Sequence, residues 1–183
     1  ALAANTTGGT LVAIGKDALQ ANTTASHNVA IGHDALQANQ TGTDCVAVGG
    51  NALQANTVSN NTAVGRSALY TSSTGIKCVA VGSASLYNSN ADNCTALGYS
   101  ALSGNTTGTR GTAVGSEALE ANTTANKNTA VGYQCMHATT TGADNTAVGA
   151  YALLANTTGT NNVAMGQGSL ENNVGASFNT AIG

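Results

Sequence analysis

The chain has 183 residues and a formal net charge of −3, and only 7% of its residues are charged and 3% aromatic. Ordinary soluble domains are about a quarter charged, so Asn, Thr, Ser and Gly must carry most of the contact with water. The few charges form no basic face of the kind that nucleic acid requires, and no apolar run is long enough to span a bilayer. We therefore expect no nucleic-acid partner and no membrane insertion.

One short pattern repeats along the whole chain, and such a period indicates a solenoid or a related repeat fold. The consensus is N-T/V-A-V/I-G-x-x-A-L-x-A-N-T-T-G-x-x, and we number its positions 1 to 17. The spacing is 17 residues, shortened to 16 in the blocks that begin at Cys45 and Cys78. The blocks begin at Leu11, Asn28, Cys45, Asn61, Cys78, Cys94, Gly111, Asn128, Asn145, Asn162 and Asn179.

Each block predicts the same short elements, which the block at 28–44 illustrates. Residues 28–31 alternate between β-branched and small side chains, which predicts a strand whose positions 2 and 4 face the interior and whose alanine faces outward. Gly32 ends the strand, residues 35–39 predict a second short strand, and residues 39–44 make the return turn. The chain is therefore expected to be all-β, a parallel β-solenoid or β-roll of about eleven coils. At about 4.8 Å per coil, the rod would be about 50 Å long.

Position 3 is alanine in every block, beside an invariant glycine at position 5. A core built only from positions 2, 4 and 9 would be thin, and small outward residues would let another chain pack closely. We therefore expect a second buried surface, most simply around a three-fold axis; the alternative is that alanine is only an undemanding surface residue. The residues assigned to this packing are Ala13, Ala30, Ala47, Ala63, Ala80, Ala96, Ala113, Ala130, Ala147, Ala164 and Ala181.

The segments NVAIGHDAL (28–36), NTAVGRSAL (61–69) and GTAVGSEAL (111–119) resemble the head repeats of trimeric autotransporter adhesins. Related repeats occur in trimeric phage tail fibres. The resemblance implies a left-handed parallel β-roll three chains wide, displayed outside the cell for adhesion. The coil here is longer than the family's because of the N-T-T-G turn, and the chain shows neither stalk heptads nor membrane-anchor strands.

These observations predict a structural or adhesive segment of an extracellular fibre, on a cell surface or a virion, with no cofactor and no enzymatic activity. Residues 1–183 form a single continuous array, which we expect to be part of a longer fibre or a protomer that stacks head to tail. The expected partners are further copies of the chain and a host-surface receptor or glycan. The alternatives are a protomer of a glycan-coated filament with a purely structural role and an ice- or surface-binding β-solenoid that uses the threonines of position 13.

Asn-x-Thr sequons could form a column of glycan acceptors, because six of the eight fall at position 12. The other interpretation is that N-T-T is turn chemistry, with asparagine side chains that cap the backbone or stack as amide ladders. The sequons are at Asn5, Asn22, Asn39, Asn60, Asn93, Asn105, Asn122 and Asn156.

The cysteines and histidines give no catalytic or metal signature. Cys78 and Cys94 share position 1 of adjacent coils, within reach of a disulfide, and the alternative is two free buried thiols. No C-x-x-C pair or Cys/His cluster is present, so no zinc site is expected. His27, His33 and His137 occupy three different repeat positions and predict no catalytic triad with serine and aspartate.

Overall fold

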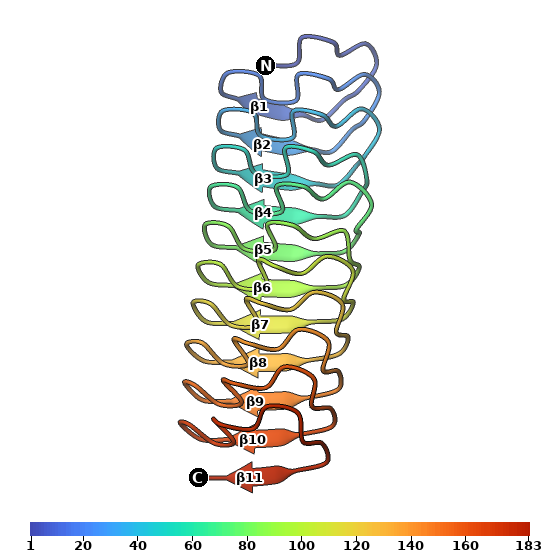
Figure 1. Cartoon of the computed structure of the whole chain (residues 1–183). Helices are drawn as coiled ribbons and strands as arrows, with labels where there is room; N and C mark the ends of the chain where they lie inside the picture. Colours follow the sequence, from blue (N-terminus) through green and yellow to red (C-terminus); the bar gives the residue numbers. More distant parts are fainter.

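A computed structural model describes all 183 residues as an all-β rod without helices. Eleven three-residue strands form one parallel sheet in which each strand pairs with the next along the chain, so the expected β-solenoid is confirmed. The strands stack along the rod, and the two termini lie at its opposite ends (Figure 1). The strands are β1 (Val12–Ile14), β2 (Val29–Ile31), β3 (Val46–Val48), β4 (Thr62–Val64), β5 (Val79–Val81), β6 (Thr95–Leu97), β7 (Thr112–Val114), β8 (Thr129–Val131), β9 (Thr146–Val148), β10 (Val163–Met165) and β11 (Thr180–Ile182).

The strands pair in register, so each repeat position lies beside the same position of the next coil. Val29 pairs with Val46 and Ala30 with Ala47, for example. The 16-residue blocks keep this register because the missing residue is removed from the return turn. In an ordinary turn the Asn39 amide donates to the carbonyl three residues later, whereas the Asn56 amide donates to Val58, two residues later.

The faces of the strands are the reverse of the expectation. The alanines assigned to packing between chains point into the coil, where nine are fully buried, and those of the two end coils are half-buried. The side chains of positions 2 and 4 point outward instead. The coil is narrow, and its interior opposite the strand is already filled by the leucine of position 9, so only a methyl group fits at position 3. The fully buried residues are Ala30, Ala47, Ala63, Ala80, Ala96, Ala113, Ala130, Ala147 and Ala164.

The expected second strand of each coil does not form, and a tight turn takes its place. The leucine or methionine of position 9 adopts a left-handed backbone, with φ between 49° and 55° in all coils. This conformation costs about 1–2 kcal/mol for a residue with a side chain. Complete burial of the leucine, at about 1.5–3 kcal/mol, offsets that cost. The backbone still bonds between coils, since the Leu36 amide donates to the Ala52 carbonyl at 3.0 Å.

In parts of the interior, buried asparagines at positions 1 and 12 bond to the asparagine at the same position of the next coil. At position 1, the Asn145 amide donates to Asn128 Oδ1 at 3.3 Å, and the Asn162 amide donates to Asn145 Oδ1 at 3.1 Å. At position 12, the Asn22 amide donates to Asn5 Oδ1 at 2.9 Å. Buried polar groups need such partners, because an unpaired one costs about 1–3 kcal/mol. The turn-chemistry interpretation of N-T-T is confirmed: position 12 amides cap the turn, as Asn39 does at the Gly42 carbonyl, and in part of the rod they also stack as a ladder.

The glycine of position 5 is required by both its conformation and its surroundings. Gly49 has φ +134°, which L side chains rarely adopt, and a Cβ added there would lie 2.6 Å from the carbonyl oxygen of Gly65. The next residue, Gly50, has no atom within 4 Å of an added Cβ. Coils can therefore stack at this corner only where position 5 has no side chain.

We expect Gly49→Ala to destabilise the rod by at least about 1–3 kcal/mol, the usual cost of a strained backbone, because the clash with Gly65 adds to the strain. Gly50→Ala is the matched control, since it adds the same methyl group one residue later in open space. Urea unfolding followed by circular dichroism measures both. Equal unfolding free energies for the two variants would contradict the requirement for glycine at position 5.

The position 12 contacts between coils are interrupted at several places, and one of them is Thr139, where threonine replaces the asparagine. Asn122 Oδ1 and Thr139 Oγ1 are both buried without a hydrogen-bond partner. We expect Thr139→Asn to raise the free energy of unfolding by about 1 kcal/mol, because the new amide can donate to Asn122 Oδ1. Thr141→Asn, at an exposed turn position, is the control and should leave stability unchanged. Thermal or urea unfolding measures the stability of both variants. A Thr139→Asn variant less stable than the wild type would refute the idea that the asparagine contacts stabilise the rod.

Candidate functional site

Variable residues occupy positions 6, 7 and 10 of each coil, which we call the variable ridge, and also positions 16 and 17 of the return turn. Positions 7 and 10 are in contact, since the Gln37 amide donates to Asp34 Oδ1 at 3.0 Å. Positions 6 and 7 of adjacent coils also meet, since the rings of Tyr133 and Tyr151 pack edge to face 5.4 Å apart. The ridge carries every tyrosine of the chain: Tyr70, Tyr87, Tyr99, Tyr133 and Tyr151.

Along the ridge, side chains at position 10 pair with the same position one coil away. The Gln54 amide donates to Gln37 Oε1 at 2.9 Å. Two coils further on, Tyr70 and Tyr87 stack with their ring centroids 5.0 Å apart and their planes 14° from parallel. The ridge therefore presents amide, aromatic and charged side chains that change from coil to coil along the rod.

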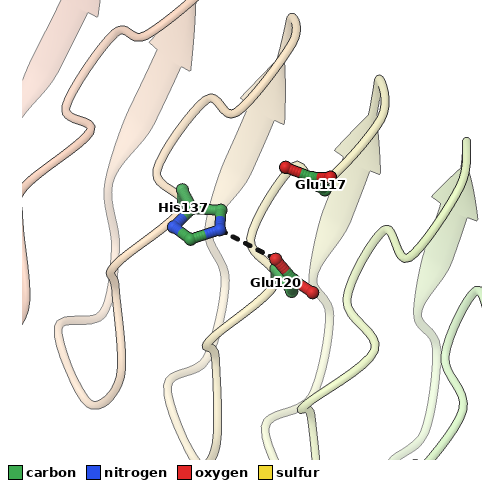
Figure 2. A group of neighbouring side chains, drawn as sticks. All are labelled: Glu117, Glu120 and His137. Atoms are coloured by element: carbon green, nitrogen blue, oxygen red, sulfur yellow. Dashed lines mark hydrogen bonds and ion pairs between the residues drawn. The ribbon is translucent and has the colours of Figure 1, made fainter.

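The ridge also contains the only group of three side chains in the molecule that could hold a metal ion. Glu117 and Glu120 follow β7, and His137 follows β8, so the group spans two coils (Figure 2). His137 Nε2 lies 2.8 Å from Glu120 Oε2, and one ligand atom from each of the three residues lies within 4.8 Å of the others. The Gln134 amide holds the Glu117 carboxylate with a hydrogen bond of 2.6 Å.

No zinc site is expected from the sequence, because it contains no C-x-x-C pair and no Cys/His cluster, and that criterion does not detect a group of two glutamates and one histidine. Glu120 and His137 share position 10, and the register of the solenoid places equal positions side by side. The group could therefore be identified from the sequence, because Glu120 and His137 share a repeat position and Glu117 stands three residues before Glu120. The three histidines themselves lie apart: His33 Nδ1 contacts Asp34 Oδ2 at 3.0 Å, and His27 Nδ1 lies 3.9 Å from Asp44 Oδ1.

The second candidate surface is the outer face of the sheet, formed by positions 2 and 4 of all strands. These side chains are half-buried or exposed, in contrast to the alanines between them. They are Val or Thr at position 2 and aliphatic at position 4, so the face is largely apolar from one end of the rod to the other. Its larger exposed members include Val79, Leu97, Val148 and Met165, each about two-fifths exposed.

The sequons do not form an exposed column of glycan acceptors. The position 12 sequons Asn22, Asn39, Asn105, Asn122 and Asn156 are all buried, with 0–1% of their surface exposed. Their amides serve the interior ladder and turn, which is the physical reason that they face inward. Asn5, in the first coil, is half-buried, and only Asn60 and Asn93 are exposed.

All four cysteines are free and buried, so the structure contains no bridge between Cys78 and Cys94. At position 1 a thiol takes over the hydrogen bond of the asparagine amide. The Asn61 amide donates to the Gly75 carbonyl at 2.7 Å, and the Cys78 thiol donates to the corresponding Ala91 carbonyl at 3.1 Å. A thiol replaces the amide because both can donate to that carbonyl.

Neighbouring groups and burial set the acidity of Cys78 and Cys135. The adjacent Cys94 thiol, together with desolvation, raises the pKa of Cys78. Desolvation raises the pKa of Cys135 to about 12, from an ordinary value of 9.0. The thiols of Cys78 and Cys135 therefore stay protonated at neutral pH and are poor nucleophiles.

No family model, curated protein or solved structure matches the chain. The structure has no helix of the length and hydrophobicity needed to cross a membrane. No pocket is present on its surface.

The raised pKa of Cys135 predicts alkaline destabilisation. The folded state holds this proton up to about pH 12, whereas an unfolded thiol loses it near pH 9. The stabilisation is therefore complete below pH 9 and is lost as the pH rises toward 12. We expect the loss of unfolding free energy between pH 8 and pH 10 to be about 1 kcal/mol smaller in Cys135→Ala, which restores the consensus alanine of position 8. Urea unfolding at both pH values measures it, and identical losses in the two proteins would contradict the burial effect.

Proposed function

We propose that the chain is a structural and adhesive segment of an extracellular fibre, without enzymatic activity, in which copies pack together through the outer face. The observation that carries the proposal is the apolar outer face of an unbroken eleven-stranded parallel sheet. Parallel sheets are normally covered on both faces, and here the interior covers only one. Large exposed apolar patches mark interaction surfaces.

A second copy of the chain is the occupant that fits this face best. The outward side chains form two straight columns, because identical positions pair from β1 to β11. Their repeat along the rod is the strand spacing, about 4.8 Å. A partner can fill the spaces between successive side chains over the whole length only if it has the same repeat, which another copy provides.

The number of chains and the location rest on the resemblance to trimeric adhesin heads. By that analogy, each chain is a left-handed β-roll, and three copies surround a common axis outside the cell. The corrected strand orientation changes which residues would meet at that axis. The valines and threonines of position 2 and the aliphatic residues of position 4 would meet at the axis, in place of the alanines of position 3.

The variable ridge supplies the adhesive part of the proposal. Tyrosine rings have apolar faces and a polar hydroxyl, and here they stand beside amide and carboxylate groups. Such a combination suits a glycan or a polar receptor surface on the host. The alternative of a glycan-coated filament loses its main support, because the position 12 sequons that would form its attachment edge are buried.

The outer face can be tested with Val131→Glu combined with Val148→Glu. These changes place charges on β8 and β9, where copies would meet, and burying unpaired carboxylates is strongly unfavourable. We expect the native mass to fall from three chains to one of 17.8 kDa. Native mass spectrometry and light scattering measure the mass, and circular dichroism verifies that the variant keeps its fold.

The matched control is Thr124→Glu combined with Thr141→Glu, which adds the same charge at exposed turn positions and should leave the assembly intact. A wild-type protein that is monomeric at every concentration would overturn the proposal. The alternative of an ice- or surface-binding solenoid, which uses the threonines of position 13, would then be favoured, and thermal-hysteresis measurements on the monomer would test it.

A further inference from the structure

We propose that Glu117, Glu120 and His137 bind a divalent transition-metal ion, with Zn²⁺ the best match, and that the ion links two adjacent coils. The inference is independent of how copies of the chain assemble. It rests on three side chains of two chemical types that converge from two coils on the variable ridge.

The chemical types of the three ligands select the metal. Zn²⁺ is commonly bound by imidazole nitrogen and carboxylate oxygen, with three protein ligands and a water in open sites. Hard cations such as Ca²⁺ and Mg²⁺ prefer sites made only of oxygen atoms. The imidazole of His137 therefore favours zinc over calcium.

The geometry needs only small side-chain movements. Ligand atoms about 2.0–2.1 Å from a tetrahedral zinc ion lie about 3.4 Å from one another. The contact between His137 Nε2 and Glu120 Oε2, now 2.8 Å, would open slightly, and Glu117, within 4.8 Å of both, would approach. The side chains of His137 and Glu120 are 36% exposed, so they can move, and water can reach the remaining coordination position.

A neighbouring residue already orients one of the ligands. Gln134, one coil along from Glu117, donates its amide to Glu117 Oε2 at 2.6 Å. Outer hydrogen bonds of this kind fix ligand orientation, and their loss typically lowers metal affinity about 10–100-fold. Gln134 is thus a positioning residue for the proposed site.

The same protein contains an internal comparison. His33 lies 3.0 Å from Asp34 and forms a similar pair of imidazole and carboxylate, but no third ligand completes it, since Glu117, Glu120 and His137 are the only group of three. If three converging ligands are needed, zinc should bind at Glu117, Glu120 and His137 and should not bind at the pair of His33 and Asp34.

A bound ion would act as a clamp between coils. Glu117 and Glu120 belong to the coil of β7 and His137 to the coil of β8, so the ion would tie together two units otherwise joined by backbone ladders and core packing. A ligand that binds only the folded state stabilises it by RT ln(1 + L/Kd), where L is the concentration of free ligand, so the stabilisation grows with that concentration. Zinc should therefore raise the melting temperature of the rod.

The test is titration of the untagged full chain with ZnCl2 in a buffer without chelators, followed by isothermal calorimetry and by thermal unfolding. We expect one saturable zinc per chain, a rise in melting temperature, and no comparable effect of CaCl2. His137→Gln and Glu120→Gln should each weaken binding at least tenfold and remove the thermal shift. Gln134→Leu should weaken binding about tenfold, and the control His33→Gln should bind like the wild type.

Circular dichroism without metal verifies that each variant is folded, and all the altered side chains are at least partly exposed. The absence of saturable binding by the wild-type chain would overturn the proposal. So would equal losses of affinity in His137→Gln and His33→Gln, because that result would mean general binding to surface histidines.

Discussion

Each residue of this chain lies beside its own repeat position in the next coil, at the spacing that backbone hydrogen bonds between parallel strands impose. The pairing of Ala30 with Ala47 and of Val163 with Thr180 shows the same register at both ends of the rod. This constraint selects residues that can contact copies of themselves at about 4.8 Å. Asparagine does so through its amide, alanine through its small size, and the glycine of position 5 through its lack of a side chain.

The narrow interior has a second consequence, which connects the fold to assembly. Since leucine at position 9 fills the coil from the turn side, the strand can contribute only a methyl group. The β-branched residues that favour the strand conformation therefore point away from the core. One requirement, a slim coil, thus produces both a stable interior and an apolar outer face, and that face is the reason to expect association between copies.

The variable ridge is where the stacking constraint is weakest. Its side chains reach into solvent, so successive coils can carry different residues as long as neighbours tolerate one another. Stacked tyrosines, paired glutamines and the contact between His137 and Glu120 are three solutions to that condition. Side chains here differ in chemistry from coil to coil, and the proposed receptor contacts and the proposed metal site lie on this ridge.

The period, the parallel in-register stacking and the asparagine turns follow from the sequence alone, because the repeat spacing and the side-chain chemistry decide these locally. The sequence could not decide which face of the strand is buried, because the alternation of two residue types does not say which type points inward. It also did not reveal that Leu36 adopts a left-handed backbone, because burial outweighs the local preference of leucine. Only the closed coil buries the sequon of Asn22 and brings Glu117 toward His137, because both depend on where the turn points after the strand has ended.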